Sequence, residues 1–403
     1  MTRIGFAFNL KPETALLRLE EDTDAPRSEE EPPSTRGGAR PRRFAKPAPA
    51  VATAEVDDEF AEWDRAETIA AVENALSALG DVVRCEAKPD LPERLRAIQP
   101  DIVFNIAEGF GGANREAHVP AICEFLGIPY SGSDPFSLSL CLDKARTKEF
   151  LAYHRVPTAA FALIRETSEV PALVARVASG RGRGALRRLR LPLFVKPVHE
   201  GSSKGITERS LCRTLEELEA QTTFVIERYA QPALVEEFLP GAEYTCAVLG
   251  NGVGARVLPI VGMNFDALPK GALPVYGFEA KWVWDVPTNP LAIFECPARI
   301  DQLLQNRIEK VVLAAYRLLG CRDWSRIDVR LDSAGVPNVV EVNPLPGILP
   351  NPEDNSCFPK AARAAGLSYD QLIQSCLKLA AERQGVFLSG KTARRARRAA
   401  ASG

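Results

Sequence analysis

Apolar and polar residues alternate most regularly between Arg326 and Gly347, where the chain runs RIDVRLDSAGVPNVVEVNPLPG. Apolar residues take every second position from Ile327 to Leu331, which is the period of a half-buried strand. Ser333-Ala334-Gly335 is a turn signal, and a second alternating run follows with Val340 and Val342 on its apolar side. The pattern predicts a β-hairpin.

The polar side of this hairpin predicts a metal site. A two-residue loop at Ala334-Gly335 places Asp328 directly opposite Glu341, and Arg326 opposite Asn343. Directly opposed side chains lie roughly 5 Å apart at Cβ, and like charges there repel. A divalent cation relieves that repulsion, and two carboxylates with an amide oxygen suit Mg²⁺. The competing interpretation is a solvated polar face, which leaves the choice of Asp, Glu and Asn unexplained.

The remaining periodicities predict strands that alternate with helices. Strands are expected at residues 4–9, 81–87, 101–105, 191–197, 233–237 and 242–250. Helices are expected at residues 69–79, 119–127, 143–154, 303–320 and 367–382, with another that starts near Thr214. Alternation in the first third predicts a parallel sheet. The loop with Asn105, Glu108 and several glycines falls at the carboxyl end of a strand, where open parallel sheets bind ligands.

Three segments lack periodicity. Residues 20–58 combine an acidic run with many Pro, Gly and Arg, and we expect a disordered insertion. The basic segment Arg181–Arg190 has no interleaved aromatic residues, so a flexible connector is favoured over a nucleic-acid patch. Residues 389–403 are basic and predict a disordered tail.

Composition is that of an ordinary globular protein and excludes several classes. The 403 residues allow two or three domains, and a net charge of −2 gives no general attraction to nucleic acid or anionic membranes. The chain has no apolar run long enough to cross a bilayer and begins without a signal-peptide pattern. Nine cysteines without a C-x-x-C pair predict reduced, mostly buried thiols in a cytoplasmic protein.

The segment LPLFVKPVHEGSSKGIT supports two hypotheses. Its G-S-S-K-G fits the G-x-S-x-G pattern of a hydrolase with Ser203 as nucleophile. That pattern needs a helix directly after the serine and a histidine downstream of it, and neither is present. A loop that covers phosphates, with glycine N–H groups, serine hydroxyls and Lys204 as donors, fits better.

Seven segments in one order give the chain its resemblance to a known family. They are GIPYSGSD with DKARTK, LPLFVKPVHEGSSKGI, LVEEFLPGAEYT, FEAKW, SRIDVRLD and EVNPLPG, all between about Pro100 and Ala381. In these segments the chain resembles the D-alanine–D-alanine ligase family of ATP-grasp enzymes. The resemblance implies an α/β ATP-grasp fold with three domains, in which a parallel-sheet domain precedes two α+β subdomains that sandwich ATP. The expected boundaries are 1–142, 143–239 and 240–388.

The resemblance also assigns site residues. Phosphate and nucleoside contacts are expected from Lys144, Lys196, Ser202, Ser203, Glu236, Phe238, Leu239, Glu243 and Lys281. Asp328, Glu341 and Asn343 are expected to hold two Mg²⁺ ions, with Mn²⁺ as a substitute. Arg326, the N–H of Gly347 and the closing Ser203 are expected at the reacting centre. The activity implied is ATP-dependent joining of a carboxylate to an amine through an acyl phosphate, for peptidoglycan biosynthesis.

The amino-acid end departs from the family pattern. Glu13 is the candidate for the missing family glutamate, Glu108 stands where the family has a histidine, and Trp282 replaces a tyrosine. Ser356 is the candidate for the acceptor carboxylate. D-Alanyl-D-alanine is the leading product, with another dipeptide or amide as the alternative. A Ser203 hydrolase and an ATP-binding regulator without turnover are the rivals, and a homodimer is compatible with the resemblance.

Overall fold

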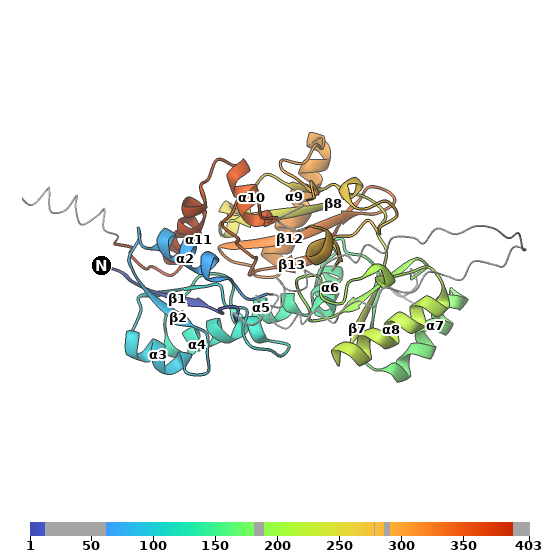
Figure 1. The fold of residues 1–403 in the computed structure, drawn as a ribbon, viewed down its shortest axis with the longest axis horizontal. Coiled ribbons are helices and arrows are strands. Elements are labelled where there is room, and N and C mark those ends of the chain that lie inside the picture. Colours follow the sequence, from blue (N-terminus) through green and yellow to red (C-terminus); the bar gives the residue numbers. More distant parts are fainter. Residues whose placement is uncertain (13–61, 181–188, 278, 286–290, 390–403) are drawn as a thin grey trace, which may run out of the picture. The chain divides into compact units, whose positions relative to one another are not determined.

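The structure is a computed structural model that describes residues 1–12, 62–180, 189–277, 279–285 and 291–389 (Figure 1). The segment Lys11–Ala61 forms a unit of its own by contacts, and only its first two residues are described. The predicted insertion, the predicted tail after Ser389 and most of the basic segment lie outside the described residues. None of the described helices is long and apolar enough to cross a membrane.

The first sheet is parallel, as the alternation of strands and helices predicts. Its strands are β1 (Arg3–Phe8), β2 (Asp81–Glu86) and β3 (Ile102–Asn105), in the order β2-β1-β3. The helices that connect or follow them are α2 (Ala66–Leu76), α3 (Leu91–Ile98) and α4 (His118–Leu126). The glycine-containing loop with Glu108 begins where β3 ends, at the edge of a parallel sheet where ligands bind.

The second sheet is antiparallel and has the order β4-β7-β5-β6. Its strands are β4 (Phe161–Ile164), β5 (Leu193–Pro197), β6 (Leu211–Cys212) and β7 (Ala233–Glu237). Helices α7 (Val170–Ser179) and α8 (Leu215–Tyr229) pack together beside these strands (Figure 1). Helix α8 begins where the sequence predicts, because the Thr214 side chain accepts a hydrogen bond from the N–H of Glu217.

The third sheet has six strands and carries the predicted metal hairpin. Its order is β11-β10-β8-β12-β13, with β9 paired to β8. The strands are β8 (Glu243–Leu249), β9 (Arg256–Val257), β10 (Val261–Met263), β11 (Phe294–Glu295), β12 (Trp324–Leu331) and β13 (Pro337–Asn343). Residues 142 and 239, the expected domain boundaries, lie between the strands of the three sheets, and the division into three domains stays a prediction.

The chain changes sheets at Pro240-Gly241. The sequence predicts two strands around this turn, and both form, but β7 belongs to the second sheet and β8 to the third. Gly241 is held against Leu331 of β12, whose carbonyl accepts the Gly241 N–H at 3.0 Å. A Cβ on Gly241 would lie 2.7 Å from that carbonyl oxygen, so a side chain does not fit there. The predicted nucleoside residues therefore lie at the junction of two sheets.

The hairpin has the predicted pairing but a different loop. Its turn spans five residues between Leu331 and Pro337, which are register partners, rather than the two residues at Ala334-Gly335. A bulge at Val340 then inserts one residue into β13 and restores the pairing further along. The expected apolar side is corrected accordingly, because Val339 is fully buried whereas Val340 is only partly buried.

The other helices pack around the sheets. They are α5 (Pro135–Leu142), α6 (Lys144–Tyr153), α9 (Gln302–Leu318), α10 (Cys357–Ala364) and α11 (Tyr369–Arg383). The sequence predicts α6, α9 and α11 but misses α5 and α10, which are short and directly precede or follow loops. The nine cysteines are free and seven of them are buried, so the expectation of mostly buried cysteines is confirmed, and their reduced state stays a prediction.

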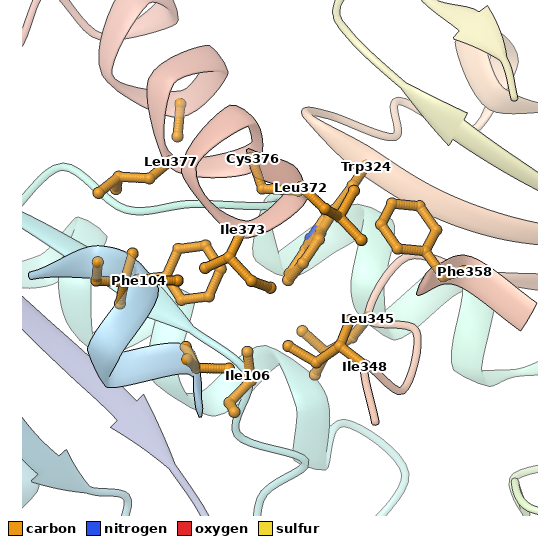
Figure 2. Close-up of a cluster of buried hydrophobic side chains, with 14 of the residues drawn as sticks. Phe104, Ile106, Trp324, Leu345, Ile348, Phe358, Leu372, Ile373, Cys376 and Leu377 are labelled. Carbon is orange, nitrogen blue, oxygen red and sulfur yellow. The ribbon is translucent and has the colours of Figure 1, made fainter. Parts of the chain in front are cut away.

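One apolar cluster packs the hairpin of β12 and β13 against the first sheet and the C-terminal helices (Figure 2). Trp324, the first residue of β12, is fully buried and lies edge-on to Phe104 of β3 and to Phe358 of α10. The ring centroids are 5.4 Å and 5.8 Å apart. Because Trp324 is four residues before Asp328, this cluster fixes the start of the strand that carries the predicted metal ligand.

We expect Trp324→Ala to lower the free energy of unfolding by about 3–5 kcal/mol, because it removes a large buried ring and leaves a cavity. Urea unfolding followed by circular dichroism measures the change. Phe125→Ala is the matched control, since the Phe125 side chain is 83% exposed and should cost little. Equal losses in the two variants would contradict this role of Trp324.

Candidate functional site

Two carboxylates of the predicted metal site face each other across β12 and β13. Asp328 is the register partner of Glu341, and Arg326 is the partner of Asn343, so the predicted pairing is confirmed. Arg326 Nη2 lies 3.0 Å from Asp328 Oδ2 and 3.5 Å from Glu341 Oε2. One guanidinium therefore offsets the repulsion between the two carboxylates in this structure.

Lys144 joins the same group from the first turn of α6. Its ammonium lies 2.9 Å from Glu341 Oε1 and donates a 2.5 Å hydrogen bond to the carbonyl of Glu200. The helix starts at this point because the Asp143 carboxylate accepts the N–H of Arg146. A predicted phosphate lysine, the predicted metal hairpin and the loop after β5 are thus in direct contact.

The residues present fit a Mg²⁺ ion that binds together with phosphates. Asp328 Oδ1 is buried and lacks a hydrogen-bond partner among the described residues, and such an acceptor is costly unless something binds it. In the described part of the chain, no group of three or more His, Cys, Asp or Glu side chains is arranged to hold a metal. Two carboxylates with the Asn343 amide form an incomplete shell. Mg²⁺ commonly completes such a shell with water and substrate phosphates.

The two carboxylates differ in their affinity for protons. Burial raises the pKa of Glu341, but nearby Lys144 and Arg326 outweigh burial and lower it to about 2. Burial raises the pKa of Asp328 above its ordinary value, with Arg326 opposing the rise and Glu341 adding to it. Glu341 is therefore ionised at all physiological pH values.

The second predicted phosphate lysine is held by a buried carboxylate. Lys196 on β5 lies 2.7 Å from Glu236 Oε1, and Lys148 of α6 lies 2.8 Å from Oε2 of the same side chain. Burial raises the pKa of Glu236, but Lys148 and Lys196 overcome it and lower the value to about 2. The side chain of Glu236 thus orients Lys196, and its predicted contact with adenine stays a prediction.

The predicted nucleoside residues follow one another across the sheet junction. Phe238 is half-buried, Leu239 is buried, and Glu243 opens β8. Glu243 Oε2 lies 2.8 Å from Arg330 Nη1 of β12. Burial raises the pKa of Glu243, while Arg330 opposes the rise.

Two serines of the loop after β5 have left-handed backbone conformations. Ser202 and Ser203 have φ values of 49° and 63°, a region that side chains other than glycine rarely occupy. The Ser203 hydroxyl donates to the carbonyl of Tyr276 at 2.9 Å. His199 lies against Asp143 instead of Ser203. The hydrolase hypothesis therefore gains no support from these contacts.

Lys281 and Trp282 lie in the π-helical turn Ala280–Trp284. Burial and the positive charge of Arg326 lower the pKa of Lys281 to about 8, while the carboxylates of Glu62 and Glu341 oppose the change. The structure therefore brings Lys281 near the metal hairpin. The Trp282 side chain lies outside the described parts.

Gly347, expected at the reacting centre, and Ser356, the candidate for the acceptor carboxylate, are in contact. The Ser356 hydroxyl donates to the Gly347 carbonyl at 3.0 Å and accepts the N–H of Leu349 at 3.2 Å. Ser356 also directly precedes α10. These bonds order the loop after the hairpin, so that the Gly347 N–H has a defined position.

Glu108 belongs to an acidic group after β3. Burial and the carboxylates of Glu116 and Glu62 raise its pKa well above the usual range, with Arg115 opposing the rise. Arg115 lies 2.9 Å from Glu62 Oε2 and donates to the carbonyl of His199 at 3.0 Å. Arg115 therefore connects this acidic group to the loop after β5. Glu13 lies outside the described residues.

Sequence reasoning missed several side chains of this site: Glu62, Arg115, Glu116, Lys148 and Arg330. A signal was present for two of them. Lys148 is four residues after Lys144, on the same face of a helix, and Arg330 is two residues after Asp328, on the same face of a strand. The other three lie in loops or short turns where no periodicity marks them.

Sequence comparisons agree with the geometry. The family model described as "D-ala D-ala ligase C-terminus" matches residues 157–378, more than half of the chain. The D-alanine–D-alanine ligase of Pelotomaculum thermopropionicum is 32% identical over 317 residues, which cover 78% of this chain and 92% of that protein. The uncharacterised protein y4sG of Sinorhizobium fredii is 34% identical over 330 residues, 80% of this chain and 89% of that protein.

Solved structures agree with the fold. The D-alanine–D-alanine ligase of Bacillus anthracis complexed with ATP matches with a TM-score of 0.61 at 20% identity, over 96% of this chain and 99% of that chain. The VanG D-Ala:D-Ser ligase of Enterococcus faecalis also gives a TM-score of 0.61 at 20% identity, over 94% and 99% of the two chains. At this identity the likeness concerns the fold, which is the expected ATP-grasp fold.

Proposed function

The chain belongs to the D-alanine–D-alanine ligase family of ATP-dependent ATP-grasp ligases, and from this premise we propose that it joins two molecules of D-alanine. One observation carries the proposal. Lys144, Arg326, Asp328 and Glu341, which come from a helix and two strands, form a single charged group. That group has the charges needed to bind a nucleoside triphosphate together with Mg²⁺.

We propose that the phosphate end is arranged by residues that are already in contact. Asp328, Glu341 and Asn343 would hold Mg²⁺, which when bound neutralises charge on the phosphates. Phosphate oxygens would replace Glu341 as the partner of Lys144, which frees Glu341 for the metal. Lys196, oriented by Glu236, and Lys281 would contact the phosphates from the other sheet and from the π-helical turn. Ser202 and Ser203 would close over them.

We propose that the chain activates a carboxylate by positioning and electrostatics. Phosphorylation turns a poor electrophile into an acyl phosphate, which an amine then attacks with loss of phosphate. Negative charge develops on the tetrahedral oxygen, and Arg326 with the Gly347 N–H would stabilise it. Ser356, which holds the Gly347 backbone, would contact the carboxylate of the acceptor.

The departures from the family pattern at Glu108 and Trp282 favour a second candidate, a ligase of the same class with another amino acid as donor. Glu108 stands where the resemblance expects a histidine, and Glu116 and Glu62 lie near it. Burial raises the pKa of Glu116 to about 7, with Glu62 adding to the rise. A buried group of carboxyls would favour a cationic ammonium, so Glu108 would contact the donor amine and Trp282 would lie near it.

Amine-dependent ADP release across a panel of amino acids, with D-alanine first, tests the proposal. Release with D-alanine, in proportion to dipeptide formed, is the expected result. Release only with another amino acid would support the second candidate. ATP binding without amine-dependent release would indicate a regulator, and ester hydrolysis lost in Ser203→Ala but indifferent to ATP would indicate a hydrolase. Either of these last two results would overturn the proposed ligase activity.

The pKa of Lys281 predicts a pH dependence. Lys281 is charged below its pKa of about 8 and neutral above it, so its contact with phosphates is lost as pH rises. We expect kcat/KM for ATP, which reports the free enzyme, to fall above pH 8. Lys281→Arg keeps the charge and should shift this fall to higher pH. Identical pH profiles for the two proteins would contradict the assignment.

We propose a cytoplasmic enzyme with amino acids and ATP as its substrates. Nine free cysteines support a reducing compartment. The formal net charge of −2 provides no general attraction to nucleic acid. A homodimer stays a prediction, as does a role in peptidoglycan biosynthesis.

A further inference from the structure

Arg330 is a buried arginine at the predicted nucleoside end that none of the above assigns. It lies on β12, is only 5% exposed, and is the register partner of Glu243 on β8. Its Nε donates a 2.6 Å hydrogen bond to the carbonyl of Leu239, and its Nη1 donates a 2.8 Å bond to Glu243 Oε2. A single guanidinium therefore holds both sides of the turn at which the chain changes sheets.

Two aromatic rings enclose this guanidinium. Arg330 Cζ lies 4.9 Å from the ring centroid of Phe238 and 5.3 Å from that of Phe265. Cation–π contacts of this length are attractive, and more so where water is excluded. Arg330 thus contacts Phe238, Leu239 and Glu243, three of the four residues expected to surround the nucleoside.

Arg330 also lies on the same strand as Asp328, one of the expected metal ligands. Asp328 and Arg330 are two residues apart on one strand, so they point to the same face at a spacing of about 7 Å. A guanidinium buried without partners would be strongly destabilising. The carbonyl of Leu239 and the carboxylate of Glu243 offset that cost here, and the same bonds restrict the orientation of the Glu243 side chain.

We propose that Arg330 is a positioning residue for the nucleotide: it orients the Glu243 carboxylate to accept the ribose hydroxyls and fixes Leu239 beside the base. The inference rests on the proposed role of Glu243. Its consequence is sugar specificity, because a carboxylate held in one orientation can accept the 2′-hydroxyl of ATP, which 2′-deoxyATP lacks. A hydrogen bond to a charged group is commonly worth about tenfold or more in binding.

Arg330→Met keeps the bulk of the side chain and removes its donors. We expect KM for ATP to rise about tenfold, with kcat at saturating ATP within about threefold of wild type and KM for the amino acid unchanged. The ratio of kcat/KM for ATP to that for 2′-deoxyATP should fall from about ten in wild type to near one. Loss of packing alone would weaken both nucleotides equally and leave the ratio unchanged.

Arg307→Met is the matched control, because Arg307 is exposed and contacts only the carbonyl of Gly335 in the hairpin turn among its described hydrogen bonds. It should keep the wild-type ratio. Arg330→Met leaves Glu243 buried without its cation, so Glu243→Gln and the double variant are measured beside it. If Arg330 acts through Glu243, Glu243→Gln and the double variant lose the preference for ATP over 2′-deoxyATP to the same extent. The double variant has no buried carboxylate without a cation, so it tests the proposal even if Arg330→Met does not fold.

The outcomes separate this inference from the proposed function. A wild-type protein that releases no ADP with any amino acid would overturn the proposed function itself. A wild-type protein that releases ADP but prefers ATP no more than 2′-deoxyATP would overturn the role of Arg330 alone. So would an Arg330→Met variant, or a double variant, that keeps the wild-type ratio.

Discussion

Glu341→Gln is expected to lower kcat with ATP and Mg²⁺ by on the order of 10²–10³-fold while the fold remains intact. Glu341 is held ionised by Lys144 and Arg326, which lower its pKa to about 2. The glutamine has almost the same shape but no charge, so the proposed metal site would lose one of its two carboxylates and Lys144 would lose its anionic partner. Steady-state ADP release measures the loss.

Glu353→Gln is the matched control, because Glu353 is exposed in the loop after the hairpin. It makes the same chemical change and should keep wild-type turnover. Circular dichroism and urea unfolding should show that both variants are folded. Near-normal turnover in Glu341→Gln would show that the metal assignment is wrong.

Arg326→Lys should also reduce kcat by on the order of 10²–10³-fold, with a much smaller change in the affinity for ATP. Arg326 reaches both Asp328 and Glu341 with one guanidinium nitrogen, and the proposed mechanism places its guanidinium beside the tetrahedral oxygen. Lysine keeps the positive charge but has neither the planar fork nor the same reach. Charge that develops on the tetrahedral oxygen would then be less well stabilised, which is a transition-state effect.

The control for this variant is Arg322→Lys. Arg322 precedes the same strand but pairs with Asp134, away from the two carboxylates. Single-turnover ADP release and equilibrium binding of ATP separate the two effects. If Arg326→Lys weakened ATP binding in full proportion to its loss of kcat/KM, with kcat unchanged, Arg326 would be a nucleotide-binding group and not a stabiliser of the transition state.

The hairpin shows what the sequence could determine and what it could not. The pairing of Asp328 with Glu341 was predictable from alternation and a turn signal. The five-residue turn and the bulge at Val340 were not, because they shift the register in opposite directions and cancel at Glu341. A strand pattern reports which side chains share a face, and a bulge changes that only locally. Val339 is therefore buried and Val340 is only partly buried, which is the reverse of what the alternation predicts.

Elements with long periodic runs were predicted well, whereas helices α3, α5, α7 and α10 were not predicted. Helix α9 has a regular apolar stripe and an Asp301 side chain that caps its first turn. Helices α5 and α10 have eight residues each, too few for the periodicity to be recognised beside neighbouring loops. The strand pattern around Pro240-Gly241 does not state which strands pair, so the expected boundary after residue 239 came from the family resemblance and not from periodicity.

The two ends of the site differed in how much the sequence revealed. The phosphate and metal end consists of charged residues on regular elements, such as Lys144 on α6 and Asp328 on β12. The amino-acid end consists of loops, where Arg115 and Glu116 acquire their roles only through neighbours distant in sequence. Long-range contacts of this kind have no local pattern. Consequently the donor remains the least determined part of the site.

A crystal structure with a non-hydrolysable ATP analogue and Mn²⁺ tests most directly whether the facing carboxylates hold the metal–nucleotide. Mn²⁺ substitutes for Mg²⁺ and can be located by its anomalous scattering. The account predicts anomalous peaks coordinated by Asp328, Glu341 and Asn343 together with phosphate oxygens. Ions bound elsewhere, with the side chains of Asp328 and Glu341 turned away from each other and from the phosphates, would contradict it.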